Sequence, residues 1–266
     1  MNYSKASVAI VMVFLMIAGA SCTDPGSAPS ISQAPNVFNP FSQDASADFD
    51  AWMSSSVTDN DWFVYTKTDR SQIDYQTLYD FRDCSAFFTT SSYGRVYPGA
   101  VRFDGQYLLA AEDTKFYSLY QGNQDFDMDG ANYIWQIDSS AEFPAITDTI
   151  MSPSSRVTIT SHAVYDSVSK SSNMVVTWSP YGVDDNVVVI TLLSTDTTAS
   201  SPVYYMDTVD DDGTHTIPAS TFSGKNNQKL TLSVSRGKYK IGNMQGGRKY
   251  LMSMYSQRNV DLRLVN

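Results

Sequence analysis

The sequence predicts an all-β protein, and two observations carry this prediction. Of the 28 acidic residues, only Glu112 and Glu142 are glutamates. Aspartate favours turns, whereas glutamate favours helices, so this bias indicates many turns and few helices. Short runs of β-branched and aromatic residues also alternate with clusters of Ser, Thr, Asp and Gly, which is the pattern of strands separated by turns.

The first 21 residues have the layout of an export signal. Lys5 supplies a positive start, residues 8–18 form a run of eleven apolar residues, and small residues lead up to Cys22. A helix of eleven residues, at about 1.5 Å per residue, is too short to cross the ~30 Å hydrocarbon core of a bilayer. Residues 1–21 are therefore predicted to be a signal peptide that is removed.

Residues 19–22, Gly-Ala-Ser-Cys, resemble the lipobox of bacterial lipoproteins, although Gly19 stands where that family usually has leucine. The resemblance implies that Cys22 becomes the first residue and carries a diacylglycerol thioether and an N-acyl chain such as palmitate. More than one acyl chain is what stable anchoring requires. Thr23 replaces the aspartate that retains enteric lipoproteins at the inner membrane, so the resemblance implies the outer membrane of the cell envelope. The alternative is an ordinary secretory signal in which the cysteine has no role.

The remaining chain is long enough for two domains but poorly suited to nucleic acid. Removing residues 1–21 from the 266-residue chain leaves about 245 residues, enough for two cores. The formal net charge of −10 becomes −11 when Lys5 is lost, and no basic cluster opposes it. We therefore expect neither nucleic acid nor anionic headgroups as partners. Cys84 is the only cysteine besides Cys22, so packing rather than an intrachain disulfide must supply stability.

The chain after the signal peptide divides into a tether and two β-regions. Residues 22–48 are rich in Pro, Ser, Ala and Asn, which predicts a flexible tether. Residues 49–140 are predicted to form a small antiparallel β-domain, with a hairpin turn at Asp104-Gly105. Its candidate strands are residues 62–66, 86–90, 96–103, 107–111, 115–120 and 133–137.

Residues 141–266 are predicted to form a second β-domain. Its candidate strands are residues 156–161, 173–178, 186–193, 202–208, 215–217, 229–235, 249–256 and 260–265. Residues 174–180, MVVTWSP, and the strand that opens at Tyr250 resemble strands of the immunoglobulin and fibronectin type III families. The resemblance implies a β-sandwich. The 71 residues between Trp178 and Tyr250 exceed the spacing in a fibronectin module, so we expect insertions or another strand order.

One acidic segment is a candidate calcium site. Asp125, Asp127 and Asp129 follow the D-x-D-x-D-G pattern that opens an EF-hand loop, in which alternate carboxylates wrap a hard cation. Gln136 occupies the twelfth position, where the loop needs a bidentate glutamate. The alternative is an acidic hairpin before the strand at 133–137. No other cofactor is expected, and the second acidic turn, residues 207–213, is interpreted as a solvated hairpin.

The sequence predicts no catalytic residues. His162 and His215 are the only histidines, both stand in alternating strand patterns, and no G-x-S-x-G elbow is present. Cys84 lies where a buried strand is predicted to begin, so it is interpreted as a packed thiol rather than a nucleophile. The chain is therefore predicted not to be an enzyme.

The functional prediction follows from the anchor, the tether and the β-regions. We expect a membrane-anchored, non-catalytic lipoprotein of the cell envelope whose β-domains are displayed to bind a glycan or a protein. The candidate contacts, whose alternative role is core packing, are Tyr117, Tyr120, Tyr133, Tyr204 and Tyr205. Two alternatives stay open. One is a lipid-anchored hydrolase that acts on polysaccharide or peptide through aspartates, and the other is a structural subunit of an envelope assembly.

Overall fold

The computed structural model describes residues 63–74, 78–89, 97–111, 116–118, 126–140, 143–179, 186–196, 199–243 and 249–266. The predicted signal peptide, the tether, Cys22 and Asp125 lie outside these residues. The described residues form strands, turns and one short 3₁₀ helix at Ala219–Phe222, which confirms the all-β prediction. Among them, no helix is long and apolar enough to cross a membrane.

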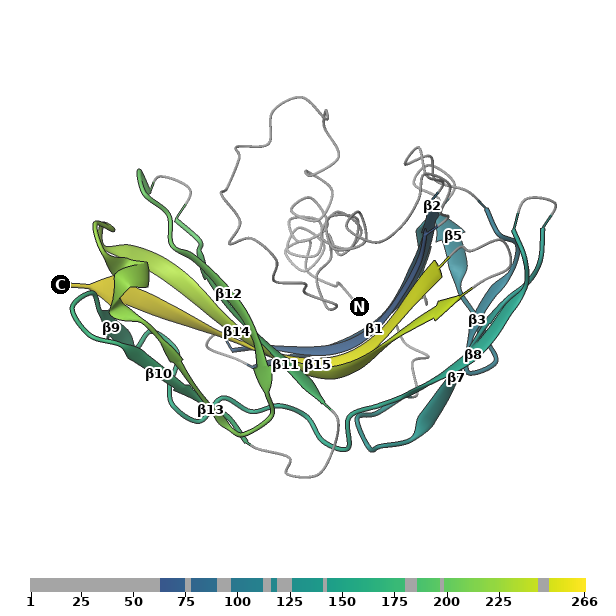
Figure 1. Ribbon diagram of the computed structural model, residues 1–266, viewed down its shortest axis with the longest axis horizontal. Coiled ribbons are helices and arrows are strands. Elements are labelled where there is room, and N and C mark those ends of the chain that lie inside the picture. Colours follow the sequence, from purple (N-terminus) through teal and green to yellow (C-terminus); the bar gives the residue numbers. More distant parts are fainter. Residues whose placement is uncertain are drawn as a thin grey trace, which may run out of the picture. The chain divides into compact units, whose positions relative to one another are not determined.

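Two long strands are the spine of the protein. β14 (Gln228–Asn243) and β15 (Lys249–Val265) pair antiparallel over the whole length of β14 (Figure 1). They lie in the middle of a nine-stranded sheet with the order β12-β11-β14-β15-β1-β2-β6-β5, and β9 pairs with the end of β15. The other strands of this long sheet are β1 (Phe63–Asp74), β2 (Leu78–Thr89), β5 (Leu109–Ala111), β6 (Phe116–Ser118), β9 (Ser167–Ser169), β11 (Val187–Ser194) and β12 (Tyr204–Asp210).

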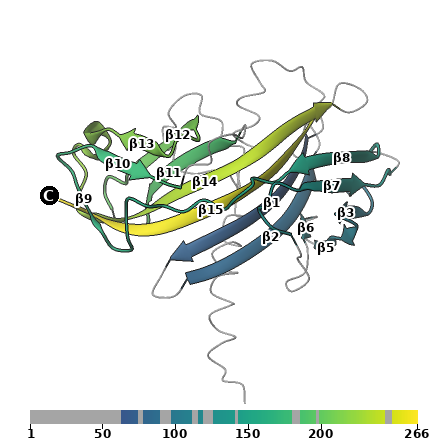
Figure 2. The same cartoon turned by 90° about the horizontal axis from the view of Figure 1, so that it is seen from below.

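The long sheet mixes both kinds of strand pairing. β1 runs parallel to β15 and antiparallel to β2, so the β1–β2 hairpin extends the sheet on one side of the spine (Figure 2). β11 and β12 extend it antiparallel on the other side, next to β14. The two strands that are most distant in the sequence, β1 and β15, are therefore neighbours in the sheet.

Two smaller sheets complete the described fold. A four-stranded antiparallel sheet has the order β4-β3-β7-β8, and a two-stranded sheet pairs β10 with β13. Their strands are β3 (Val101–Phe103), β4 (Gln106–Tyr107), β7 (Asn132–Ile137), β8 (Ile146–Met151), β10 (Met174–Thr177) and β13 (Thr214–Ile217). The predicted hairpin is confirmed, because Asp104 and Gly105, with φ of 48° and 80°, form the turn between β3 and β4.

The spine contributes to two hydrophobic clusters through one face. Side chains of a strand point alternately to its two sides, so even-numbered residues of β15 share a face. Tyr250, Met252 and Met254 belong to the first cluster, which also contains Trp135 of β7. Further along the same strand, residues 260, 262 and 264 belong to the second cluster. One face of β15 therefore serves both cores.

The second cluster is the core of a β-sandwich, in which the long sheet packs against the two-stranded sheet. Side chains of β11, β14 and β15 in the long sheet pack against Met174 and Val176 of β10 and Ile217 of β13. Trp178 belongs to the same core and is 2% exposed. The 3₁₀ helix adds the fully buried Phe222 to this core.

The strand boundaries differ from the predicted ones in the spine and in the β1–β2 hairpin, where the predicted strands 62–66 and 86–90 extend over 63–74 and 78–89. The predicted strands 249–256 and 260–265 are one strand, because polar residues 257–259 continue the pairing with both neighbours. β8 and β9 were not predicted, and residues 156–161 form only an isolated bridge between Ile159 and Trp178. The predicted boundary at 140/141 falls between β7 and β8, which pair with each other.

Two glycines of β14 allow close approach of aromatic residues of β15. Gly237 is paired with Tyr255, and Gly242 with Tyr250. A Cβ atom at Gly237 would overlap the backbone and Cβ of Tyr255, and one at Gly242 would overlap the Tyr250 ring. Glycine opposite an aromatic residue is a known device for fixing strand register.

Candidate functional site

In the acidic loop before β7, the described carboxylates contact other groups of the protein. Asp127 Oδ1 accepts a hydrogen bond of 2.8 Å from the next backbone N–H and lies 3.3 Å from an Arg156 guanidinium nitrogen. Asp129 Oδ1 accepts one of 2.9 Å from the N–H two residues on. Within the described residues, no three His, Cys, Asp or Glu side chains gather around one point. The remaining predicted calcium ligand, Asp125, lies outside the described residues, so the calcium site stays a prediction.

His162 lies beside a serine whose hydroxyl also contacts the backbone. Its Nδ1 is 2.6 Å from Ser161 Oγ, and that oxygen also accepts a hydrogen bond of 3.0 Å from the Thr177 backbone N–H. Burial lowers the pKa of His162, against the opposing charge of Asp166. The Asp166 carboxylate accepts a hydrogen bond of 2.8 Å from the Ala163 backbone N–H. Backbone N–H groups therefore engage both the serine and the aspartate, which supports a structural role for His162.

Two further expectations about single residues have clear outcomes. Cys84 is fully buried in the first cluster, as expected for a packed thiol. The prediction that residues 207–213 form a solvated hairpin is wrong for Asp211, whose side chain is only 3% exposed. Its neighbour Asp212 is exposed and accepts a hydrogen bond of 3.0 Å from the Thr214 backbone N–H, as a turn aspartate should.

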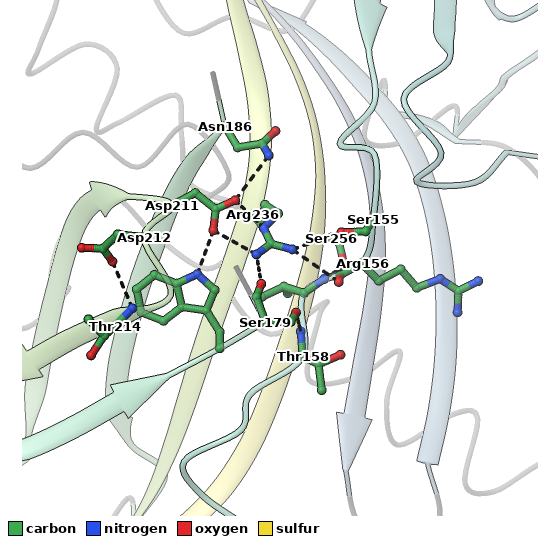
Figure 3. Close-up of polar contacts among 12 residues, drawn as sticks. Ser155, Arg156, Thr158, Ser179, Asn186, Asp211, Asp212, Thr214, Arg236 and Ser256 are labelled. Atoms are coloured by element: carbon green, nitrogen blue, oxygen red, sulfur yellow. Dashed lines mark hydrogen bonds and ion pairs between the residues drawn. The ribbon is translucent and has the colours of Figure 1, made fainter. Parts of the chain in front are cut away.

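Asp211 is buried because it is the counter-ion of a buried arginine (Figure 3). Arg236 has a fully buried side chain, and its Nε lies 2.7 Å from Asp211 Oδ2. A second guanidinium nitrogen donates a hydrogen bond of 2.9 Å to Asp211 Oδ1. The same carboxylate accepts hydrogen bonds from Trp178 Nε1 at 2.8 Å and from Asn186 Nδ2 at 3.4 Å. A buried charge needs such partners, because desolvation without them costs several kcal/mol.

Arg236 lies on the spine between the two hydrophobic clusters. It follows residues 230, 232 and 234 of the second cluster on the same face of β14, and it is paired with Ser256 of β15. Its guanidinium also donates to the carbonyl oxygen of Ser179 and, at 3.5 Å, to that of Arg156. Ser256 Oγ accepts a hydrogen bond of 3.1 Å from the Val157 backbone N–H. This polar cluster therefore fastens residues 156–157, which follow β8, to the middle of the spine.

The four-stranded sheet presents a second, outward surface that we call the outer face. Residues of this sheet that do not point into the first cluster share it, because side chains alternate along each strand. The strand register places one row of it across all four strands, in the order Tyr107, Arg102, Gln136 and Thr147. The remaining members are Asn132, Ile134, Thr149 and Met151, in two adjacent pairs of β7 and β8.

The row ends in an exposed aromatic ring. Tyr107 is 62% exposed, the highest value among the exposed large apolar side chains of the described residues. The Arg102 guanidinium carbon lies 5.1 Å from the centre of the Tyr107 ring, and one of its nitrogens lies 2.5 Å from Asp138 Oδ1. Asp138 therefore fixes Arg102, and Arg102 fixes the Tyr107 ring. A ring fixed in this way is suited to contact a planar or ring-shaped ligand.

The tyrosines predicted as ligand contacts have mostly other roles. Tyr117 and Tyr133 are 3% and 7% exposed and belong to the first cluster, so core packing is confirmed for both. Tyr204 and Tyr205 are partly buried on β12, and Tyr120 lies outside the described residues. The Tyr117 hydroxyl donates a hydrogen bond of 3.0 Å to the carbonyl of residue 99. Burial, and after it the neighbouring Tyr97, raise the pKa of Tyr117 to about 12.

The sequence reasoning missed Tyr107, although a signal was present. The Asp104-Gly105 turn joins two strands that end at Phe103 and begin at Gln106. In a two-residue hairpin these two residues pair with each other, so Tyr107 pairs with Arg102 instead. Tyr107 therefore points away from Phe103, which is buried. The opposite faces of these two aromatic residues follow from hairpin register alone.

Comparisons with known proteins give the chain no family. No family model matches it, and no curated protein matches it. One similar solved structure is a crystal structure of DIP-gamma IG1+IG2, with 10% sequence identity and a TM-score of 0.23. The match covers 79% of this chain and all of that one.

Proposed function

We propose that the protein is a membrane-anchored, non-catalytic lipoprotein of the cell envelope that displays its β-sheets to bind a glycan or a protein partner. The lipobox-like residues that end at Cys22 support the anchor. The 26 residues 23–48 of the predicted tether would separate the described sheets from the bilayer by roughly 30 Å, the root-mean-square length of a flexible chain of that size.

The outer face is the single observation that carries the binding proposal. Its surface combines an exposed ring at Tyr107, a guanidinium at Arg102, and amide and hydroxyl groups at positions 132, 136, 147 and 149. An aromatic ring next to donors and acceptors suits the apolar and hydroxyl faces of a sugar, and it equally suits the centre of a protein interface. The face stands on four hydrogen-bonded strands, so little ordering would be needed on binding.

The hydrolase alternative finds less support in the described residues. Hydrolysis through aspartates needs two carboxyl groups at a fixed separation on either side of a substrate. Asp211 is neutralised by Arg236, and Asp148 is engaged by Lys240 at 2.5 Å and by the Tyr250 hydroxyl. The partners of Asp148 outweigh its burial and lower its pKa, so it is a poor proton donor at neutral pH.

The binding proposal is tested with the purified chain carrying Cys22→Ser, which cannot be lipidated, on arrays of glycans and of extracellular proteins. We expect a specific ligand, and we expect Tyr107→Ala to weaken it at least about tenfold, or 1.4 kcal/mol. Tyr165→Ala is the matched control, because Tyr165 is 47% exposed and lies 5.2 Å from the Arg263 guanidinium, but outside the outer face. A ligand whose affinity is the same in Tyr107→Ala would contradict the site, and a folded chain without any ligand would favour the structural-subunit alternative.

A further inference from the structure

The turn between β12 and β13 brings together three side chains with metal-ligand chemistry. Tyr205 and Asp207 are two residues apart on β12, so they point to the same side of that strand. His215 lies on β13, in the smaller sheet of the sandwich. The imidazole therefore approaches the phenol and the carboxylate from the opposite layer, at the edge strand of the long sheet.

The three ligand atoms form a compact triangle. Tyr205 Oη is 2.6 Å from His215 Nε2 and 3.2 Å from Asp207 Oδ2, and the last two atoms are 3.5 Å apart. In a tetrahedral site with bonds of about 2.0–2.2 Å, ligand atoms lie about 3.3–3.6 Å apart. Two sides of the triangle are already close to this range, and the third would open by about 0.7 Å.

The neighbouring groups orient the Asp207 carboxylate, and one side of the three-residue group is open to solvent. Asp207 Oδ1 accepts a hydrogen bond of 2.9 Å from the Thr208 backbone N–H, which turns Oδ2 toward the other two ligands. The side chains of His215 and Asp207 are 17% and 40% exposed, so water can complete the coordination. Within the described residues, the ion-pair partner of Asp207 is His215 rather than a lysine or arginine. Outer contacts of this kind orient ligands and sustain metal affinity.

We propose that Tyr205, Asp207 and His215 bind a divalent first-row transition ion of the zinc class at the edge of the sandwich. His215 Nε2, Asp207 Oδ2 and Tyr205 Oη each form one bond to the ion, and water occupies the fourth position. The Tyr205 hydroxyl gives its proton to solvent when its oxygen ligates the ion, and no electron is transferred. The ion links β12 of the long sheet to β13 of the smaller sheet.

The phenol gives the proposal a specific readout. A tyrosine hydroxyl has an ordinary pKa of about 10, so without metal it keeps its proton at neutral pH. Metal ligation should therefore release a proton and produce the ultraviolet difference band of tyrosinate. A hydrogen-bonded trio with a purely structural role would give neither signal.

The test is a titration of the full-length chain carrying Cys22→Ser with Zn²⁺ alone, by calorimetry in two buffers of different ionisation enthalpy and by difference absorption. We expect one ion per chain, proton release and the tyrosinate band. His215→Gln should lower the affinity at least about tenfold. Tyr205→Phe should abolish the proton release and the band. His162→Gln is the control, because it removes the other histidine and should change nothing.

Three results would overturn the metal site. They are no zinc binding by the parent chain, unchanged binding in His215→Gln, or an equal loss in His162→Gln. Unfolding midpoints measured without zinc show whether a variant is folded. If His215→Gln is not folded, Asp207→Asn replaces it, since the amide has the shape of the carboxylate and the side chain is 40% exposed. Unchanged zinc affinity in Asp207→Asn would be equally decisive against the site.

Discussion

Replacing Asp211 by alanine should destabilise the protein strongly. The substitution leaves the Arg236 guanidinium buried without its counter-ion and removes the hydrogen-bond acceptor of Trp178 Nε1. Both partners of the ion pair have side chains no more than 3% exposed, so solvent cannot replace the lost contacts. Breaking a buried pair in this way costs about 3–5 kcal/mol, which is a large share of the stability of a typical protein.

Urea unfolding at equilibrium, followed by tryptophan fluorescence, measures this loss. Asp212→Ala is the matched control, since Asp212 is the adjacent exposed aspartate and should cost about 1 kcal/mol or less. The double variant Asp211→Ala/Arg236→Met should lose less stability than the sum of the losses in the two single variants, by at least about 1 kcal/mol. Equal losses in Asp211→Ala and Asp212→Ala, with unchanged m values, would refute the buried ion pair.

Three further predictions concern the spine, the acidic loop and the tyrosines. Gly237→Ala should destabilise by about 1–3 kcal/mol in urea unfolding, because the new Cβ would overlap the backbone of Tyr255; a neutral effect would contradict that packing. If the acidic loop binds calcium, Asp127→Ala should lower the thermal unfolding midpoint only when calcium is present. A parent midpoint that does not change on addition of calcium would rule out the site. Since the pKa of Tyr117 is raised to about 12 in the folded state, its contribution to stability is complete below about pH 10 and lost as the pH rises toward about 12. Urea midpoints across that range should fall less in Tyr117→Phe than in the parent, and parallel curves would show that Tyr117 is not responsible.

The fold class could be predicted because it depends on local patterns. The hairpin at Asp104-Gly105 is correct, since two residues with positive φ suffice to define it. The length of β15 could not be predicted in the same way, because polar residues 257–259 interrupt its apolar alternation. They belong to the strand because β1 and β14 lie on both sides and satisfy its backbone. The length of such a strand therefore depends on pairing with residues far away in the sequence.

The buried ion pair shows where sequence reasoning reaches its limit. Asp211 stands among exposed aspartates, and turn composition alone predicted that it would be solvated. The signal lay in its partner, because Arg236 continues the even-numbered apolar positions 230, 232 and 234 of β14. A charged residue on a buried face requires a counter-ion. The sequence does not say which of many aspartates supplies it, since only the fold brings the two residues together.

The candidate binding surface was predictable only in kind. The sequence offered tyrosines as candidate binding contacts, with core packing as the alternative, and the five named tyrosines do not include Tyr107. Burial distinguishes core tyrosines from exposed ones, and burial depends on which strands the four-stranded sheet contains. β8, one of those strands, was not predicted, so its outward residues could not be assigned to a surface.

Lipid attachment at Cys22 is the central functional claim, and metabolic labelling with a tagged palmitate in a bacterial host tests it most directly. The account predicts a labelled chain that sediments with the membrane fraction. It also predicts that Cys22→Ala abolishes the label and leaves the chain either uncleaved or soluble. Cys84→Ala is the control and should keep both properties, because Cys84 is fully buried. Label that is retained in Cys22→Ala, or a parent chain without label, would contradict the account.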